Sequence, residues 1–250
     1  MPAAASTPRP RRAHPELRGD HHVHSTFSDD ARSTLTENVA AAHEVGLTSL
    51  CLVDHVRRDT TWVPELVAAV RALDIPESLT VSTGVETKIL DASGTLDLPP
   101  LPPGVDRVLI ADHQLPGPDG PLSPSQAREL LAEDTSPDDL LDLLVGALVA
   151  AMGRYPGNQL AHCFSILPKI GLDESLLGAE RLGAWARTAA STGTTVEVNE
   201  KWGCPGPHAL AAARAAGVAL VASTDSHRAS EVGRYDRVVQ LLDDLEKSTP

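Results

Sequence analysis

Seven short apolar segments, spaced along the chain and separated by helical patterns, constrain the fold more than any other feature of the sequence. Each segment is β-branched or aliphatic and is bounded by polar residues, which is typical of strands buried in a parallel sheet. The predicted strands are residues 17–22, 48–53, 79–85, 108–111, 159–162, 194–198 and 218–223. Their alternation with helices predicts a single α/β domain, because no Ser/Gly-rich linker divides the chain.

Helix signals lie between these segments. Thr34 and Glu37 form a capping-box pattern before residues 38–45, and Gly46 follows as a stop. Ser-Pro pairs at 123–124 and 136–137 place Pro at the first turn of two further helices. Additional helices are predicted at residues 63–73, 174–192, 207–216 and 230–245. The pattern predicts a distorted seven-stranded (β/α)7 TIM-like barrel, with an open doubly wound sheet as the alternative.

Histidine and carboxylate side chains recur where the predicted strands end. The carboxyl ends of barrel strands meet at one face, so these side chains are expected to converge there. Imidazole together with carboxylate suits Zn²⁺, Mn²⁺ or Fe²⁺ and disfavours Ca²⁺, which prefers oxygen ligands alone. The sequence therefore predicts a divalent-metal site built from these strand ends. The candidates are His22, His24, His55, Glu86, His113, His162, Asp225 and His227.

The remaining histidines and Asp20 are not predicted to be metal ligands. Asp20, His22 and His24 are expected on one face of the first strand. Asp20 is expected to orient a metal-binding imidazole without contacting the metal itself. His21 is expected to point away from the metal site. Three more histidines are interpreted as structural or solvent-exposed, namely His14, His43 and His208.

Charge restricts the partners. The chain has 21 Lys plus Arg against 34 Asp plus Glu, a net charge of −13, which opposes binding to long nucleic acid. A small phosphorylated substrate held by local basic residues remains compatible with this charge. Three basic side chains that follow strand ends are candidates for holding its phosphate: Arg57, Lys169 and Arg228. The loop after the sixth strand is a weaker candidate for the rest of the substrate, through Asn199, Lys201 and Trp202.

Location is predicted from the cysteines and the chain ends. The three cysteines make no C-x-x-C pair, which excludes a disulfide framework or a thiolate zinc site and suits the cytoplasm. No segment is long and apolar enough to indicate a membrane span. Residues 1–18 are rich in Pro, Ala and Arg without an apolar centre, so they are interpreted as a mobile tail preceding a domain at 19–250.

The polar strand ends also form an ordered series of motifs. These are D-x-H-x-H at 20–24, D-H at 54–55, G-x-E at 84–86, single histidines at 113 and 162, and D-x-H at 225–227. In this respect residues 20–227 resemble the polymerase-and-histidinol-phosphatase (PHP) superfamily, in its stand-alone phosphatase form. The resemblance implies a distorted seven-stranded barrel that holds two or three divalent ions.

The resemblance also implies how the ligands are shared. His22, His24, Glu86 and Asp225 would hold a first metal, and Glu86 would bridge to a second. The second metal would take His113 and His162. A third would take His55, His227 and either Asp29 or Asp30, of which Asp30 is preferred because the residues after it align without a gap.

The activity implied by the resemblance is hydrolysis of a phosphate ester. We expect a histidinol-phosphatase-like phosphomonoesterase that acts on a small phosphorylated metabolite, with a metal-bridged hydroxide as nucleophile and no catalytic residue beyond the metal ligands. One alternative is a phosphodiesterase or exonuclease acting on nucleotides or short oligonucleotides. A non-catalytic module of the same superfamily is the more distant alternative, disfavoured because the ligands persist and no polymerase body is attached.

Overall fold

The computed structural model describes residues 14–247, and its centre is a parallel sheet of seven strands. The sheet order is β1-β2-β3-β4-β7-β8-β9, so each strand pairs with the next one along the chain. A doubly wound sheet would reverse direction within this order, which excludes that alternative. The strands are β1 Gly19–Val23, β2 Ser49–His55, β3 Thr80–Lys88, β4 Arg107–Ala111, β7 Gln159–Ala161, β8 Thr195–Asn199 and β9 Leu220–Ser223.

The first and last strands approach each other and nearly close the sheet. Val23 forms a parallel bridge with Ser226, and the backbone N–H of His24 donates to the carbonyl of Ser226 at 2.9 Å. These contacts join the carboxyl ends of β1 and β9, the end that carries the polar motifs. The predicted seven-stranded barrel in a single α/β domain is thus confirmed.

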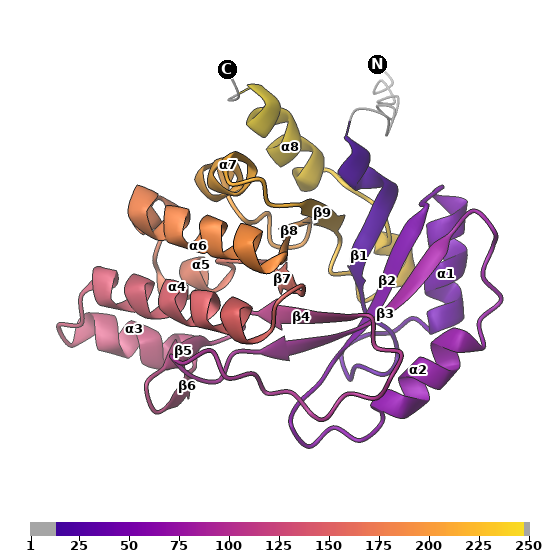
Figure 1. Ribbon diagram of the computed structural model, residues 1–250, viewed down its shortest axis with the longest axis horizontal. Coiled ribbons are helices and arrows are strands. Elements are labelled where there is room, and N and C mark those ends of the chain that lie inside the picture. The colour runs from indigo at the N-terminus through magenta and orange to yellow at the C-terminus, as the bar shows by residue number, and fades with distance from the viewer. Residues whose placement is uncertain (1–13, 248–250) are drawn as a thin grey trace, which may run out of the picture.

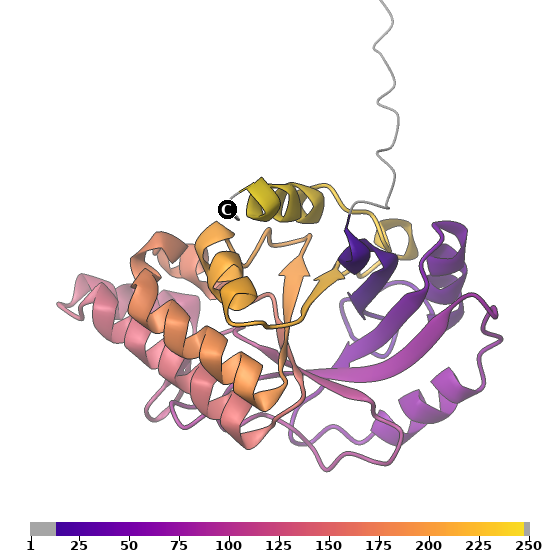
Figure 2. The same cartoon turned by 45° about the horizontal axis from the view of Figure 1, so that its top comes forward.

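Helices lie around the outside of the strands (Figures 1 and 2). Thr34 and Ser123 each make a complete capping box, and the Ser136 side chain accepts a hydrogen bond from the backbone of Asp139, as the sequence signals indicated. The α-helices are α1 Leu35–Glu44, α2 Val63–Arg71, α3 Pro124–Ala132, α4 Pro137–Arg154, α5 Ile166–Ile170, α6 Gly178–Thr192, α7 Pro207–Ala215 and α8 Arg237–Lys247. The 3-10 helices are η1 Pro15–Arg18, η2 Glu174–Leu177 and η3 Ala229–Glu231.

Two apolar layers position the polar end of the barrel. Outside the strands, large side chains pack between strands and helices, with Trp185 and Phe164 fully buried in the largest cluster. Another buried cluster joins mostly small side chains from three strands, Cys51, Val53, Leu109, Ala111 and Ala161. The side chains from β2 and β4 point to the same face of the sheet as His55 and His113, because side chains alternate along a strand. They therefore form a buried apolar layer inside the barrel, next to the polar side chains.

The chain ends differ from the sequence prediction. Residues 1–13 of the predicted tail lie outside the described residues, whereas 14–18 belong to the folded domain. Leu17 is buried, and His14 is buried between Asp243, at 2.9 Å, and Glu246, at 3.3 Å. The prediction of a mobile tail is wrong for these five residues because they pack against α8.

The predicted helix at 230–245 is wrong at its start. Gly233 has φ +63 and donates its N–H to Asp20, so the chain turns there, and α8 begins at Arg237. Glu200 accepts hydrogen bonds from the backbone N–H groups of residues 236, 237 and 238, which fixes that start. Two elements were missed: helix α5 and the hairpin formed by β5 Leu115–Gly117 and β6 Gly120–Leu122. Among residues 14–247, no helix is long and apolar enough to cross a membrane.

Candidate metal centre

All eight strand-end histidines and carboxylates predicted as ligands gather at the carboxyl end of the barrel. They come from the ends of β1, β2, β3, β4, β7 and β9 or from the first residues after them. His21, by contrast, lines a small cavity at the opposite end with Arg18 and Ser49, as strand alternation predicts. His43 in α1 and His208 in α7 are exposed on the helices, also as predicted.

The first group of ligand atoms is fully buried. Nε2 of His22 and Nε2 of His24 lie 2.9 Å apart. Oε2 of Glu86 lies 3.3 Å from the first nitrogen and 3.5 Å from the second. Oδ1 of Asp225 lies 3.4 Å from Nε2 of His24 and 4.0 Å from that of His22. These four side chains can therefore offer two nitrogens and two oxygens to one ion.

Glu86 lies at the centre of the whole constellation. Its Oε1 is 3.1 Å from Nε2 of His113 and 3.0 Å from Nε2 of His162, while its Oε2 is 2.9 Å from Nδ1 of His55. One carboxylate thus faces imidazoles from both sides. This is the arrangement that a bridging ligand between two ions requires.

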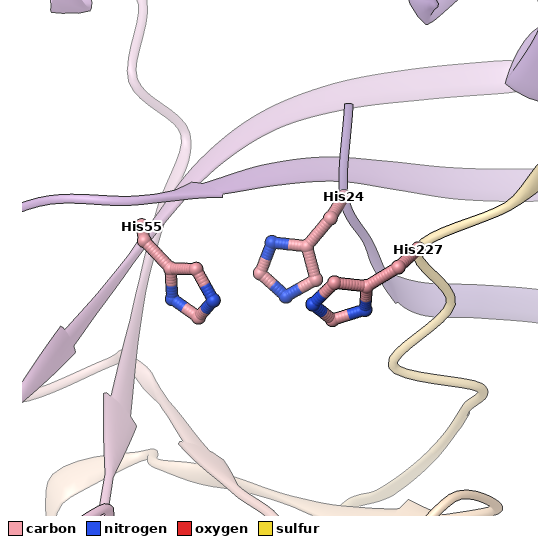
Figure 3. Close-up of side chains that lie close together, drawn as sticks. All are labelled: His24, His55 and His227. Atoms are coloured by element: carbon pink, nitrogen blue, oxygen red, sulfur yellow. The ribbon is translucent and has the colours of Figure 1, made fainter. Parts of the chain in front are cut away.

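A third group extends from the buried His24 toward solvent, where the side chains of His55 and Asp30 are partly exposed. His24, His55 and His227 form a set in which the rings of His55 and His227 each lie 4.4 Å from that of His24 (Figure 3). Oδ2 of Asp30 lies 3.2 Å from Nε2 of His227 and 3.7 Å from Nε2 of His55. Asp29 and Asp30 both line the neighbouring cavity, but these contacts with the imidazoles are made by Asp30. The geometry therefore favours Asp30 over Asp29 for this group.

Glu197 in β8 is a functional candidate that the sequence prediction missed. Its Oε2 lies 3.0 Å from Nδ1 of His22 and accepts a hydrogen bond from Nε2 of Gln159 at 3.0 Å. A carboxylate at Nδ1 fixes the tautomer of His22, so that its Nε2 lone pair points at the centre. A lone carboxylate between two valines, in the middle of a short apolar strand, is the signal that could have revealed it.

Asp20 does not orient an imidazole, so that prediction is wrong. Its carboxylate accepts hydrogen bonds from the N–H of Thr224 at 2.9 Å, the Oγ1 of Thr224 at 2.6 Å and the N–H of Gly233 at 2.9 Å. The cause is the neighbouring position of β9, which brings the Thr224 backbone against this side chain. Asp20 therefore holds the segment that carries Asp225 and His227.

Two other strand-end carboxylates have similar roles. Asp54 accepts hydrogen bonds from the N–H and Oγ of Ser25 and from Oγ of Ser28, which fixes the loop that leads to Asp30. Asp112 accepts from Oγ of Ser165, whose oxygen lies 3.1 Å from Nδ1 of His162. The loops that carry the candidate ligands are thus tied to the barrel by buried hydrogen bonds.

Backbone strain is found at two of the candidate ligands. His162 has φ 30 and Asp225 has φ 51, both in the left-handed region that non-glycine residues seldom adopt. Such conformations persist only where the surrounding contacts hold them, and they concentrate at functional sites. Both residues turn their side chains toward Glu86 and His24 respectively.

The electrostatics favour a positive charge at the centre. Burial raises the pKa of Glu86, but His22 and His113 hold that pKa well below its ordinary value. Burial also lowers the pKa of His24 to about 3, which leaves it neutral and able to ligate. Burial lowers the pKa of His22 too, yet Glu197, Glu86 and Asp225 raise it well above normal. A proton and a metal ion would therefore compete for this position.

The donor set fits divalent metal ions. Oε2 of Glu86 is buried and has no hydrogen-bond partner, although imidazole nitrogens surround it. Within residues 14–247, three groups bring ligand atoms within 4.8 Å of one another. Nitrogen and carboxylate oxygen in this mixture suit Zn²⁺, Mn²⁺ or Fe²⁺. The three groups are His22, His24 and Asp225; His55, Glu86 and His113; and His24, His55 and His227.

Two cavities adjoin the centre on different sides. One, of about 620 Å³, is lined by His55, Glu86 and His113, and its wall includes the predicted phosphate-binding residue Arg57 together with Lys88. The second, of about 690 Å³, is lined by Asp30, Asp225 and His227, and Arg228 is part of its wall. The structure thus places Arg57 and Arg228 beside the centre on separate sides.

The loop after β8 also reaches the centre. Nε1 of Trp202 donates a hydrogen bond to Oδ2 of Asp225 at 2.9 Å, and Nζ of Lys201 lies 3.5 Å from Oδ1 of the same carboxylate. Nζ of Lys169 lies 3.7 Å from the centre of the Trp202 ring. Asn199 is buried and accepts a hydrogen bond from the Trp202 backbone, so it shapes this loop.

The protein is an α/β barrel, and its strand ends bring together buried imidazoles and carboxylates. It therefore belongs to the class of barrel proteins that can bind metal ions at the carboxyl end of the sheet. Residues 20–201 match the family model of the PHP domain, and the chain belongs to this family. The superfamily resemblance deduced from the motifs is confirmed.

Similar proteins extend over nearly the whole chain. A probable phosphatase of Caldanaerobacter subterraneus is 27% identical over 230 residues, covering 90% of this chain and 82% of the relative. A probable phosphatase of Vibrio parahaemolyticus is 25% identical over 237 residues, covering 92% and 86%. The crystal structure of histidinol phosphate phosphatase from Lactococcus lactis, complexed with zinc, L-histidinol and phosphate, superposes with a TM-score of 0.66. It is 16% identical and covers 92% of this chain and 93% of that one, a likeness that shows the shared fold.

Proposed function

We propose that this protein is a metal-dependent phosphomonoesterase acting on a small phosphorylated metabolite. The observation that carries the proposal is the position of the Glu86 carboxylate, buried among imidazoles from four strand ends and flanked by two cavities whose walls include basic side chains. Relatives named as probable phosphatases support the same reaction class.

The ligands divide among two or three ions. His22, His24, Glu86 and Asp225 would hold the first ion, and Glu86 with His113 and His162 the second. His55, His227 and Asp30 would hold a third, on the solvent side. When bound, such ions lower the pKa of a coordinated water toward neutrality and neutralise charge on the phosphoryl oxygens.

The chain's own residues orient these ligands and exclude water. Glu197 keeps the Nδ1 proton of His22 facing away from the centre, and Ser165 lies against Nδ1 of His162. The first group is buried, whereas about a third of the His55 side chain is exposed (35%). Substrate therefore approaches from the side of His55 and Asp30. No general acid or base beyond the ligands is required, because the ions stabilise the leaving oxygen.

In this proposal three basic residues would hold the phosphate and its substituents, namely Arg57, Arg228 and Lys169. Arg57 and Arg228 stand on opposite sides of the centre, in the walls of the two cavities. Lys169 stands over Trp202, whose indole touches Asp225. Arg can contact a phosphate through two parallel hydrogen bonds, whereas Lys supplies a point charge.

Cavity size and overall charge favour a small monoester. Cavities of about 620 and 690 Å³ match the size of metabolite-binding sites. The net charge of −13 opposes a long phosphate backbone. A phosphodiesterase that accepts nucleotides or short oligonucleotides is the second candidate, because both cavities include basic side chains that could contact a phosphate.

The test compares p-nitrophenyl phosphate with bis-p-nitrophenyl phosphate, before and after chelation. We expect chelator-sensitive hydrolysis of the monoester, loss of that hydrolysis in His22→Ala, and an unchanged circular dichroism spectrum in the variant. Cleavage of the diester alone would support the second candidate. Monoester hydrolysis that survives both chelation and His22→Ala would overturn the metal mechanism.

A further inference from the structure

The cavity of about 690 Å³ beside the centre has a highly charged wall, with five basic side chains and five carboxylates. It is continuous with the candidate ligands Asp30, Asp225 and His227, so whatever occupies it lies next to the reacting phosphate. Five basic side chains of a chain with net charge −13 line it, namely Arg32, Lys201, Arg228, Arg234 and Arg237. The field that a ligand meets in this cavity depends on how the five carboxylates of the same wall are engaged.

The carboxylates of the same wall are mostly engaged elsewhere. Asp30 and Asp225 face imidazoles of the centre. Both oxygens of Glu200 accept hydrogen bonds from backbone N–H groups at the start of α8, and Glu231 accepts one from the N–H of His227. Asp236 is the remaining carboxylate of the wall. With metal ions at the centre, the charges of Asp30 and Asp225 would be compensated by those ions, and five basic side chains would face three carboxylates in this wall.

The segments that carry the basic side chains are fixed before any ligand binds. Asp20 holds the segment after β9 through Thr224 at one end and Gly233 at the other. The N–H of Arg32 donates to the carbonyl of His227 at 2.9 Å, which joins the loop after β1 to that segment. Nη1 of Arg237 donates to the carbonyl of Lys201 at 2.9 Å. An anion bound here would meet a preorganised site.

The other cavity has a different character. Phe27 and Trp62, whose rings lie 5.4 Å apart, form an aromatic part of its wall, and its cations are Arg57 and Lys88. The basic cavity has no aromatic side chain in its wall. The two sides of the metal centre therefore differ in the chemistry that they can recognise.

We propose that the substrate carries a second anionic group, a phosphate or a carboxylate, which binds in the basic cavity while the scissile phosphate lies at the metal centre. This proposal rests on the proposed phosphomonoesterase function and narrows its substrate class. Arg32 and Arg234 are the specificity-determining residues of this subsite, because their side chains line it and neither is among the candidate metal ligands.

The experiment uses three matched series of synthetic monoesters on the metal-loaded full chain. Short linear alkyl phosphates of increasing length carry a hydroxyl, a carboxylate or a second phosphate at the end opposite the scissile phosphate. Released inorganic phosphate gives kcat/KM for each compound at one fixed, physiological ionic strength, because salt screens contacts between charges. The carboxylate and bisphosphate series distinguish the two sources of the second charge.

The variant Arg32→Gln/Arg234→Gln removes two charges from the cavity. The matched control Arg154→Gln/Arg214→Gln removes two charges from the last turns of α4 and α7, which lead into the opposite end of the barrel. The control separates a local contact from a change in net charge. Circular dichroism checks that both variants are folded.

At the best chain length, a compound with a second anionic group should exceed its hydroxyl analogue by at least about tenfold in kcat/KM. Arg32→Gln/Arg234→Gln should abolish most of this preference, and the control should keep it. Equal kcat/KM across all series in the wild type, or a preference that survives in the cavity variant, would overturn the proposal. Failure of the wild type to hydrolyse any monoester would instead refute the proposed phosphatase function.

Discussion

Replacing Glu197 with Gln removes the charge behind His22 while preserving the size of the side chain. The carboxylate accepts four hydrogen bonds: from Nδ1 of His22, Nε2 of Gln159, the N–H of His162 and Nδ2 of Asn199. A Gln side chain has one oxygen, which can serve one pair of these donors. Its amide group would face the other pair and leave both donors unsatisfied.

The contacts of Glu197 predict two effects of the substitution, a loss of stability and a loss of metal affinity. A buried donor that loses its partner costs about 1–3 kcal/mol, so two donors predict a loss of about 2–6 kcal/mol in the free energy of unfolding. Loss of the carboxylate also weakens the orientation and basicity of the His22 imidazole. Substitutions behind a metal-binding imidazole lower metal affinity by about 10–100-fold.

Two measurements separate these effects. Urea unfolding of the chelated protein gives the stability, and competition with a chromophoric chelator gives the metal affinity. Glu174→Gln is the matched control, because its carboxylate accepts a backbone hydrogen bond from Gly206 away from the centre. The control should lose stability and retain metal affinity. A folded Glu197→Gln protein that binds metal as tightly as the wild type would refute the role assigned to Glu197.

Three further predictions follow from the same contacts. Asp30→Asn should lower the metal content by up to one ion per chain, as measured by elemental analysis, whereas Asp29→Asn should not, and equal effects would contradict the choice of Asp30. Trp202→Phe keeps a ring beneath Lys169 but removes the hydrogen bond to Asp225, so metal affinity should fall by about tenfold in a chelator titration. Wild-type affinity in this variant would show that Trp202 does not position Asp225. Burial and the charge of Arg107 lower the pKa of His21 to about 4, below its unfolded value of about 6.5, so the unfolded state takes up a proton first as the pH falls. The free energy of unfolding of the chelated wild type should therefore fall by about 2 kcal/mol more than that of His21→Gln between about pH 7 and pH 5. His43→Gln, which removes an exposed histidine, is the control and should behave like the wild type. Equal losses in all three proteins would contradict this reasoning.

The barrel could be predicted from the sequence because its local signals agree. Each buried strand is a short apolar run, and the capping residues Thr34, Ser123 and Ser136 mark true helix starts. The start of α8 was predicted too early in the chain because it depends on Glu200, which is distant in sequence. The hairpin β5–β6 was missed because it is short and contains Pro116 and Pro121, residues that seldom occur in strands.

The candidate ligands were predictable because they occupy strand ends, where barrel topology dictates convergence. The roles of the buried carboxylates behind them were not, because those roles depend on which strands are neighbours. Asp20 faces Thr224 across the junction of β1 and β9, and Glu197 faces His22 across the barrel interior. Neither contact leaves a local pattern in the sequence.

The metal content of the purified protein, paired with p-nitrophenyl phosphate hydrolysis before and after chelation, tests the central claim most directly. The arrangement around Glu86 predicts two or more Zn, Mn or Fe ions per chain and phosphate release that chelation abolishes and added metal restores. A folded protein with no bound metal and no hydrolysis, even after Mn²⁺ or Zn²⁺ is added, would contradict it.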